Sequence, residues 1–208
     1  MSIKELQKDL LASFGEKLTA FGFEKKAKNQ SFYRYFEGGW AAVHLSFIQH
    51  AEDFDVTISV SIRFDDVEGL VNSSNNILTK KEKKGTSTLG VELGNLSVGE
   101  QKRWKISSEN QVPLVADSLL ETFEVFGEPY LAKYSSIQSA FELLSSDDKN
   151  AWKHCPFHAA RAKRAIAIAK ILEHPDMQKQ ISTRRQFLED IKDFGLSDFV
   201  RFAKRLSS

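Results

Sequence analysis

One stretch of strict alternation limits what this chain can fold into. From Phe54 to Phe64 every second residue is apolar, and the residues between them are polar or charged. Successive side chains of a β-strand point to opposite faces, so this pattern gives one apolar face and one polar face. We therefore predict a β-strand over these residues, in a sheet that buries one face and leaves the other open.

Two segments before this strand and two after it complete the predicted sheet. The segment Gln30–Glu37 is dense in aromatic residues, the Gly38-Gly39 pair can form a two-residue turn, and Trp40–Gln49 resumes as a strand. This order is typical of a β-hairpin. Shorter alternating stretches within residues 86–93 and 102–107 predict two more strands. The sequence thus predicts an antiparallel sheet of about five strands.

Helical periodicity occurs on both sides of the predicted sheet. Apolar residues between Ile3 and Phe21 recur at steps of three and four, which predicts an amphipathic N-terminal helix. From Ser108 onward the same periodicity continues to the end of the chain. No Pro/Gly/Ser-rich linker separates residues 1–108 from 109–208, and the sheet needs a cover for its apolar face. We expect an α+β fold in which residues 1–208 form a single compact unit, with a C-terminal helical layer over the sheet.

Composition sets the expected compartment. The chain has one cysteine, Cys155, so it can form no intramolecular disulfide, which favours a reducing environment. Charged residues interrupt the first nine positions, so they do not form a signal-peptide core. No segment approaches the roughly 20 apolar residues that span a bilayer. We expect a soluble cytoplasmic protein that has no membrane partner.

The open face of the predicted sheet is the main candidate site. The predicted register places Tyr33, His44 and Ser59 in one cross-strand row. A histidine beside a serine is the beginning of nucleophilic catalysis, but an orienting acid and an oxyanion donor are not identifiable, so a binding surface is the better interpretation. The candidate binding residues on this face are Tyr33, Tyr35, Trp40, His44, Ser59 and Arg63.

The same register raises a question about Arg34, which falls on the apolar side of the sheet. A charged side chain there has to reach a sheet edge or pair with a carboxylate, unless a bulge shifts the strand. All three alternatives are compatible with the sequence.

A cluster of potential metal ligands occurs at His154-Cys155-Pro156-Phe157-His158. It could hold a metal, or it could activate a thiol at the start of a helix. Pro156 prevents the two histidines from sharing one continuous helical face, and no second His/Cys cluster completes a tetrahedral site. We therefore predict a capped helix start with an inert cysteine and no metal. Because nucleotide-binding loops and metalloprotease motifs are also missing, we expect no cofactor.

Basic residues form three groups that could contact phosphate. The first, Lys80–Lys84, is interpreted as a charged solvated loop. The net charge of +1 is far from that of a typical nucleic-acid-binding domain, so we regard a nucleic-acid partner as unlikely. The three groups are Lys80, Lys81, Lys83 and Lys84; Lys102, Arg103 and Lys105 around Trp104; and Arg161, Lys163, Arg164 and Lys170.

The first 70 or so residues resemble a bacterial domain family of unknown function. That family has a helix, the pattern Gly-Phe-x-Lys-Lys, then Phe-Tyr-Arg, and a strand that ends in Gln. The resemblance implies an α+β fold, a bacterial cytoplasmic source and no established activity. Arg34 and Gln49 match the pattern, and they could be functional or could tie the sheet edge to the helices. The matching segments are Phe21–Lys26, Ser31–Arg34, Phe47–Gln49 and Phe54–Phe64.

These features support three functional interpretations. The first is a non-catalytic protein-binding module, of the immunity or antidote type by analogy with other small bacterial α+β families. The alternative is an enzyme or a small-ligand-binding protein that uses the open sheet face. The third is nucleic-acid binding through the basic loops.

Overall fold

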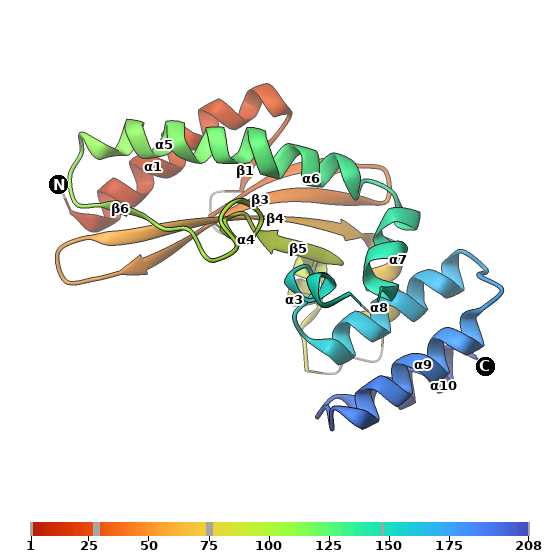
Figure 1. Ribbon diagram of the computed structural model, residues 1–208. Coiled ribbons are helices and arrows are strands. Elements are labelled where there is room, and N and C mark those ends of the chain that lie inside the picture. Colours follow the sequence, from red (N-terminus) through yellow and green to blue (C-terminus); the bar gives the residue numbers. More distant parts are fainter. Residues whose placement is uncertain (1, 27–29, 74–76, 147, 208) are drawn as a thin grey trace. The chain divides into compact units, whose positions relative to one another are not determined.

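The computed structural model describes residues 2–26, 30–73, 77–146 and 148–207 and has the predicted α+β fold (Figure 1). Contacts within the chain group it into two compact units. The first unit contains residues 1–61 and 91–132, and the second contains residues 62–90 and 133–208. This division does not follow the change from strands to helices near residue 108. That the whole chain behaves as one compact unit stays a prediction.

The N-terminal helix α1 (Ile3–Leu18) confirms the predicted amphipathic helix. Ser2 and Glu5 form a reciprocal capping box that satisfies free amides at its start. The helix ends in the 3₁₀ turn η1 (Thr19–Phe21) and at Gly22, whose φ of 76° is left-handed. Its buried face consists of Leu6, Leu10, Phe14, Gly15 and Leu18.

In the described residues the sheet contains six strands, with the order β1-β2-β3-β4-β5 and with β6 also paired to β4. The pairs β1–β2, β2–β3 and β4–β6 are antiparallel. The short edge strand β1 was not predicted, because its three residues carry no alternating apolar signal. The strands are β1 (Glu24–Lys26), β2 (Ser31–Phe36), β3 (Gly39–Gln49), β4 (Phe54–Phe64), β5 (Leu89–Glu92) and β6 (Trp104–Ile106).

The β2–β3 hairpin is present, but its predicted turn is wrong by one position. Phe36 pairs with Gly39, so the turn residues are Glu37 and Gly38 and not the Gly-Gly pair. Gly38 has a φ of 80°, a left-handed conformation that glycine adopts without a steric penalty. The pairing shifts by two residues, and an even shift keeps every side chain on its predicted face.

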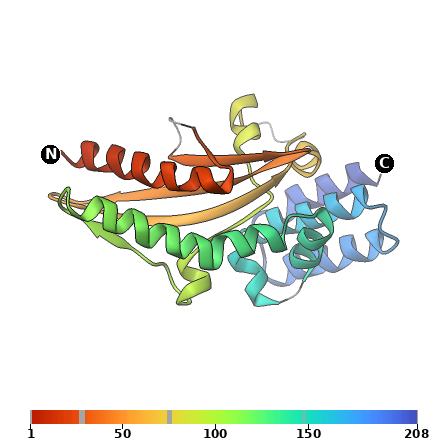
Figure 2. The same cartoon turned by 90° about the horizontal axis from the view of Figure 1, so that it is seen from above.

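Two helical segments cover the Phe32 face of the sheet in the first unit. Figures 1 and 2 show α1 running beside α5 (Gln111–Thr122) over this face. The Phe14 and Phe32 rings meet edge to face at 5.6 Å between centroids, and Phe23 meets Phe123 at 5.7 Å. After α5 the chain continues through the π-helical turn η2 (Phe123–Gly127) into α6 (Glu128–Lys133). The short helix α4 (Gly94–Ser97) lies between β5 and β6 in the sequence.

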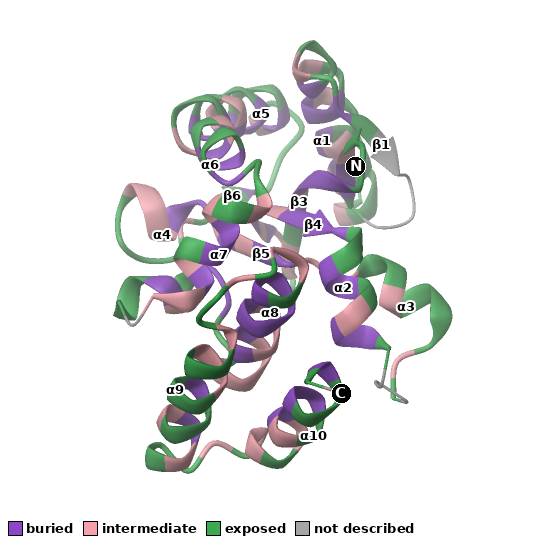
Figure 3. Cartoon of the chain, turned by 90° about the vertical axis from the view of Figure 1, so that its right-hand side faces the viewer, coloured by how far each residue is buried: buried purple, intermediate pink, exposed green. Residues whose placement is uncertain are grey.

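The second unit is built around α8 (His158–Ile171), which contacts α2, α7, α9 and α10. Its alanines permit close helix approach, and Figure 3 shows α8 largely in the colour of buried residues. The other helices of this unit are α2 (Asp65–Asn72), α3 (Lys80–Gly85), α7 (Ile137–Ser145), the 3₁₀ turn η3 (Lys149–Lys153), α9 (Met177–Asp190) and α10 (Leu196–Leu206).

The helix α3 corrects one prediction. The lysine-rich segment at 80–84 was interpreted as a loop, but it forms a short helix. Thr79 accepts a hydrogen bond from the Glu82 amide, while the Glu82 carboxylate accepts one from the Thr79 amide. This reciprocal cap satisfies free amide groups at the helix start and offsets the repulsion among the lysines.

Candidate functional site

The β2–β3 hairpin carries a cluster of aromatic side chains, here called the hairpin aromatic surface: Tyr33, Tyr35 and Trp40. Tyr35 pairs with Trp40 across the strands. The Tyr33 ring stacks on Tyr35 at 6.0 Å and meets Trp40 edge to face at 5.1 Å. Trp40 is buried, whereas Tyr35 is 54% exposed. The surface therefore presents an exposed ring that two neighbouring rings hold in place.

The predicted row of Tyr33, His44 and Ser59 is wrong in its first member. Tyr33 lies opposite Ala42, and His44 lies opposite Ser31 instead. The Ser31 hydroxyl and His44 Nδ1 share a hydrogen bond of 2.7 Å. The sequence pattern missed Ser31, because the two-residue shift of the register was not visible in it. That His44 and Ser59 are neighbours stays a prediction.

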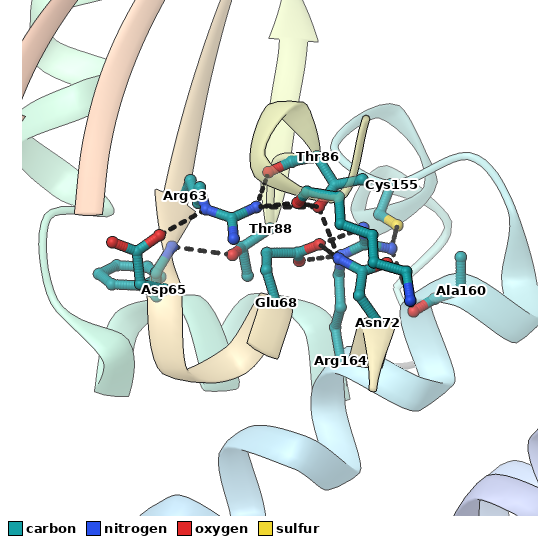
Figure 4. A network of polar contacts seen from close by, with 11 residues as sticks. Arg63, Asp65, Glu68, Asn72, Thr86, Thr88, Cys155, Ala160 and Arg164 are labelled. Atoms are coloured by element: carbon teal, nitrogen blue, oxygen red, sulfur yellow. Dashed lines mark hydrogen bonds and ion pairs between the residues drawn. The ribbon is translucent and has the colours of Figure 1, made fainter. Parts of the chain in front are cut away.

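Arg63 is buried and is not part of an exposed face. Its Nε lies 2.5 Å from the Asp65 carboxylate, and its Nη1 donates to the carbonyl oxygens of Lys83 and Thr86. Figure 4 shows the contacts of Arg63 with Asp65 and Thr86. Together with the Lys83 contact they connect the end of β4 to α3 and to the residue that follows it. Arg63 therefore stabilises the second unit.

A buried ion pair adjoins Arg63 in the same polar network (Figure 4). Arg164 Nε and Nη2 donate to the two carboxylate oxygens of Glu68 at 2.8 and 3.1 Å, and Asn72 donates to one of them. Glu68 is fully buried. Burial is the largest single effect on the pKa of Arg164 and lowers it, but the charges of Glu68 and Cys155 and their hydrogen bonds with Arg164 together hold the pKa above its usual value. This arrangement joins α2 to α8.

The predicted inert cysteine also lies at this network. Burial raises the pKa of the Cys155 thiol, and the nearby Arg164 guanidinium, 4.0 Å away, offsets this only in part. A protonated thiol is a poor nucleophile and a poor metal ligand. Among the described residues, no group of three or more His, Cys, Asp or Glu side chains could hold a metal ion.

The predicted helix start after Pro156 is confirmed, but the predicted cap is wrong. α8 begins at His158, and the residue before it, Phe157, has no side chain that can accept from the free amides.

His154 gives the second unit a specific pH dependence. Burial, with a smaller contribution from the charges of Lys133 and Lys153, lowers the pKa of His154 from 6.5 to about 4. The unfolded chain therefore takes up a proton at a higher pH than the folded chain does. The stability that His154 contributes is present above pH 6.5 and is lost as the pH falls towards 4.

We expect the wild-type protein to lose about 1–2 kcal/mol more stability than a His154→Asn variant between pH 7 and pH 5, after allowance for solvent screening. Urea denaturation at both pH values measures the difference. Equal losses in the two proteins would show that His154 does not titrate in this way.

The two residues of the family pattern have different environments. Arg34 pairs with the Glu128 carboxylate at 2.8 Å, donates to the Phe21 carbonyl and lies over the Phe23 ring at 4.7 Å. Of the three alternatives for Arg34, pairing with a carboxylate is therefore confirmed. The ion pair connects β2 to the start of α6. Gln49 is exposed at the end of β3.

Several side chains of the basic groups are buried or paired within the described part of the chain. Arg161 and Arg164 are largely buried in the second unit. In the first unit, Lys105 pairs with Asp53 at 3.1 Å, and Lys102 lies over the Trp104 ring at 4.7 Å. Contacts within the protein thus occupy several of the cations that a phosphate backbone would need.

The chain matches no family model, no curated protein and no solved structure. The resemblance of residues 1–70 to the bacterial domain family therefore stays a prediction. Of the helices in the described part of the chain, none has the length and apolar character needed to cross a membrane.

Proposed function

We propose that this chain is a non-catalytic protein-binding module that holds its partner through the hairpin aromatic surface. The observation that supports this proposal is the exposed Tyr35 ring stacked on Tyr33, with Trp40 beside them. Tyrosine and tryptophan are the residues most enriched at the energetic centres of protein interfaces. Their rings offer a large contact area and lose little conformational freedom on binding.

The hairpin also keeps this surface ordered before any partner arrives. Cross-strand pairing from Ser31 to Phe36 fixes the backbone on both sides of the rings. A pre-ordered surface avoids part of the entropy loss that accompanies association.

We place this module in the bacterial cytoplasm, and we propose that it blocks its partner in the manner of an immunity or antidote protein. The resemblance to the bacterial family and the single, buried cysteine support this setting.

A pull-down from the cytoplasm of the source bacterium tests the proposal. Tagged wild-type protein is expected to capture one stoichiometric protein, and Tyr35→Ala is expected to reduce its recovery about tenfold, the effect of losing one central contact. The matched control is Leu114→Ala, which removes an exposed apolar side chain from α5 in the same unit. We expect this control to retain the partner, and thermal unfolding checks that both variants are folded.

Recovery of the same partner at the wild-type level by Tyr35→Ala would exclude the hairpin aromatic surface as its binding site. A wild-type protein that captures no specific protein would contradict the function itself.

A further inference from the structure

The helix α3 gives the second unit a positively charged surface, here called the lysine surface: Lys80, Lys81, Lys83 and Lys84. Three of these side chains are exposed and Lys83 is half-buried. Figure 3 shows α3 in the colours of exposed and intermediate residues. Of the ion pairs formed among the described residues, none involves a lysine of this helix.

The acidic residue of α3 does not pair with these lysines. Its carboxylate, on Glu82, accepts hydrogen bonds from the amide and the hydroxyl of Thr79 at 2.8 and 2.7 Å, so it caps the start of the helix. The four lysines and one glutamate leave α3 with a net charge of +3. This charge faces solvent.

The spacing of the lysines makes them repel one another. Lys80 and Lys84 are four positions apart, and Lys81 and Lys84 are three apart. Like charges at these two spacings are neighbours on a helix surface and destabilise it. An anionic ligand on this surface would remove that repulsion in addition to its own attraction for the lysines.

Buried contacts hold α3 in place in spite of the repulsion. The buried Arg63 donates to the Lys83 carbonyl at 2.9 Å and to the Thr86 carbonyl at 2.6 Å. Asn72 donates to the Thr86 hydroxyl at 2.8 Å. The backbone under the lysines is therefore ordered before a ligand binds, which reduces the entropy lost on association.

An exposed aliphatic side chain lies close to the lysines in the sequence. Ile77 is 93% exposed and precedes Lys80 by three residues. Because apolar surface in water is unfavourable, a ligand that covers Ile77 gains free energy. The segment thus suits a ligand that combines several negative charges with an apolar group.

Two features favour a peptide over a nucleic acid or a membrane. Residues 77–88 contain no aromatic side chain on which a base could stack. Exposed carboxylates lie beside the helix, since Arg63 contacts Asp65 at 2.5 Å as well as the Lys83 carbonyl, and Asp66 is also exposed. A broad anionic membrane would meet these carboxylates, whereas a narrow peptide can follow the lysines alone.

We propose that the lysine surface and Ile77 bind an acidic peptide segment of a protein partner. Carboxylates of the segment pair with the lysines, and an apolar side chain of the segment covers Ile77. This surface lies in a different unit from the hairpin aromatic surface, so the proposal does not depend on that surface.

Fluorescence anisotropy with the full chain tests the chemistry of the ligand. The probe is a labelled peptide of six glutamates and two leucines, and the matched neutral probe carries glutamine in place of each glutamate. We expect the acidic peptide to bind about tenfold more tightly than the neutral one. Raising the salt concentration from about 0.1 M to about 1 M shortens the screening length from about 10 Å to about 3 Å and is expected to abolish the difference. Equal binding of the two peptides at low salt would overturn the proposal.

Paired charge reversals test the location of the site. Lys80→Glu/Lys84→Glu is expected to weaken binding of the acidic peptide at least about tenfold. The matched control is Lys170→Glu/Lys179→Glu, which makes the same change in net charge at exposed lysines of α8 and α9 in the same unit. The control and Tyr35→Ala are expected to stay within about twofold of wild type, and thermal unfolding checks that all three variants are folded. Equal weakening by the two charge reversals would mean that net charge alone attracts the peptide, and it would contradict the assignment.

The other anionic ligands are tested in the same buffer. Vesicles of phosphatidylserine and phosphatidylcholine are assayed by co-sedimentation, and a labelled single-stranded oligothymidylate is assayed by anisotropy. We expect both to bind more weakly than the acidic peptide. Tighter binding of either one, lost in Lys80→Glu/Lys84→Glu, would assign the lysine surface to a membrane or a nucleic acid and overturn the proposal.

Discussion

Replacing Arg164 by methionine is expected to lower the free energy of unfolding by about 3–5 kcal/mol. The substitution leaves the fully buried Glu68 carboxylate with Asn72 as a single weak donor at 3.4 Å. A buried charge that has lost its counter-ion carries a desolvation penalty that no remaining contact offsets. Urea denaturation of wild type and variant at pH 7, followed by circular dichroism, measures the loss.

The matched control is Arg185→Met in the same unit. Arg185 pairs with Glu189 at 2.7 Å across one turn of α9, but both side chains are exposed. An exposed pair of this kind contributes about 0.3–0.5 kcal/mol. If Arg164→Met costs no more than this control, the buried ion pair does not stabilise the second unit.

A double variant separates the effect of charge from that of side-chain packing. In Glu68→Met/Arg164→Met both charges are removed, and apolar side chains fill the site. We expect it to regain most of the stability that Arg164→Met loses, because replacing a buried ion pair by apolar groups is often neutral. Stability as low as that of the single variant would mean that the shape of the Arg164 side chain, and not its charge, is what matters.

The sequence predicts those parts of the fold that local periodicity determines. The alternation from Phe54 to Phe64 is uninterrupted, so β4 has the predicted bounds. The apolar repeat after Ile3 likewise defines α1, since one face of the helix has to be buried. Both patterns are long enough to be unambiguous: the two-residue period excludes a helix at β4, and the helical period excludes a strand at α1.

Features that depend on a few atoms at a turn or a cap are less visible in the sequence. Gly38-Gly39 offers two adjacent glycines, and the choice between turns one residue apart depends on the pairing of the whole hairpin. The lysines at 80–84 by themselves favour a solvated loop, and the cap formed by Thr79 and Glu82 makes them a helix. The available signal is the Thr-x-x-Glu pattern of Thr79–Glu82, which overlaps the lysines.

Among the candidate sites, those on one strand pair are also predictable from local periodicity, and those that join distant segments are not. Tyr33, Tyr35 and Trp40 could be placed together because strand pairing brings residues on one face into contact. Glu68 and Arg164 are 96 positions apart, and no periodicity relates them. The available signal is that Glu68 and Arg164 are charged residues that lie next to the buried apolar residues of α2 and α8. The close approach of Gly195 to Ala159 likewise depends on how α8 packs against a distant segment, which no local pattern encodes.

Replacing Phe32 by alanine is expected to destabilise the protein by about 3–5 kcal/mol, the usual cost of truncating a fully buried phenylalanine. Phe32 is fully buried, contacts Phe14 edge to face, and lies so close to α1 that a Cβ at Gly15 would come within 2.6 Å of its ring. At Gly15, helix α1 therefore has no side chain that could fill the cavity left by the Phe32 ring.

The matched control is Phe36→Ala, four residues along the same face of β2 but 39% exposed, for which we expect about 1 kcal/mol or less. Thermal and urea denaturation of the two variants compare them directly, and equal losses would show that the contact between α1 and the sheet is not the centre of the first unit's core.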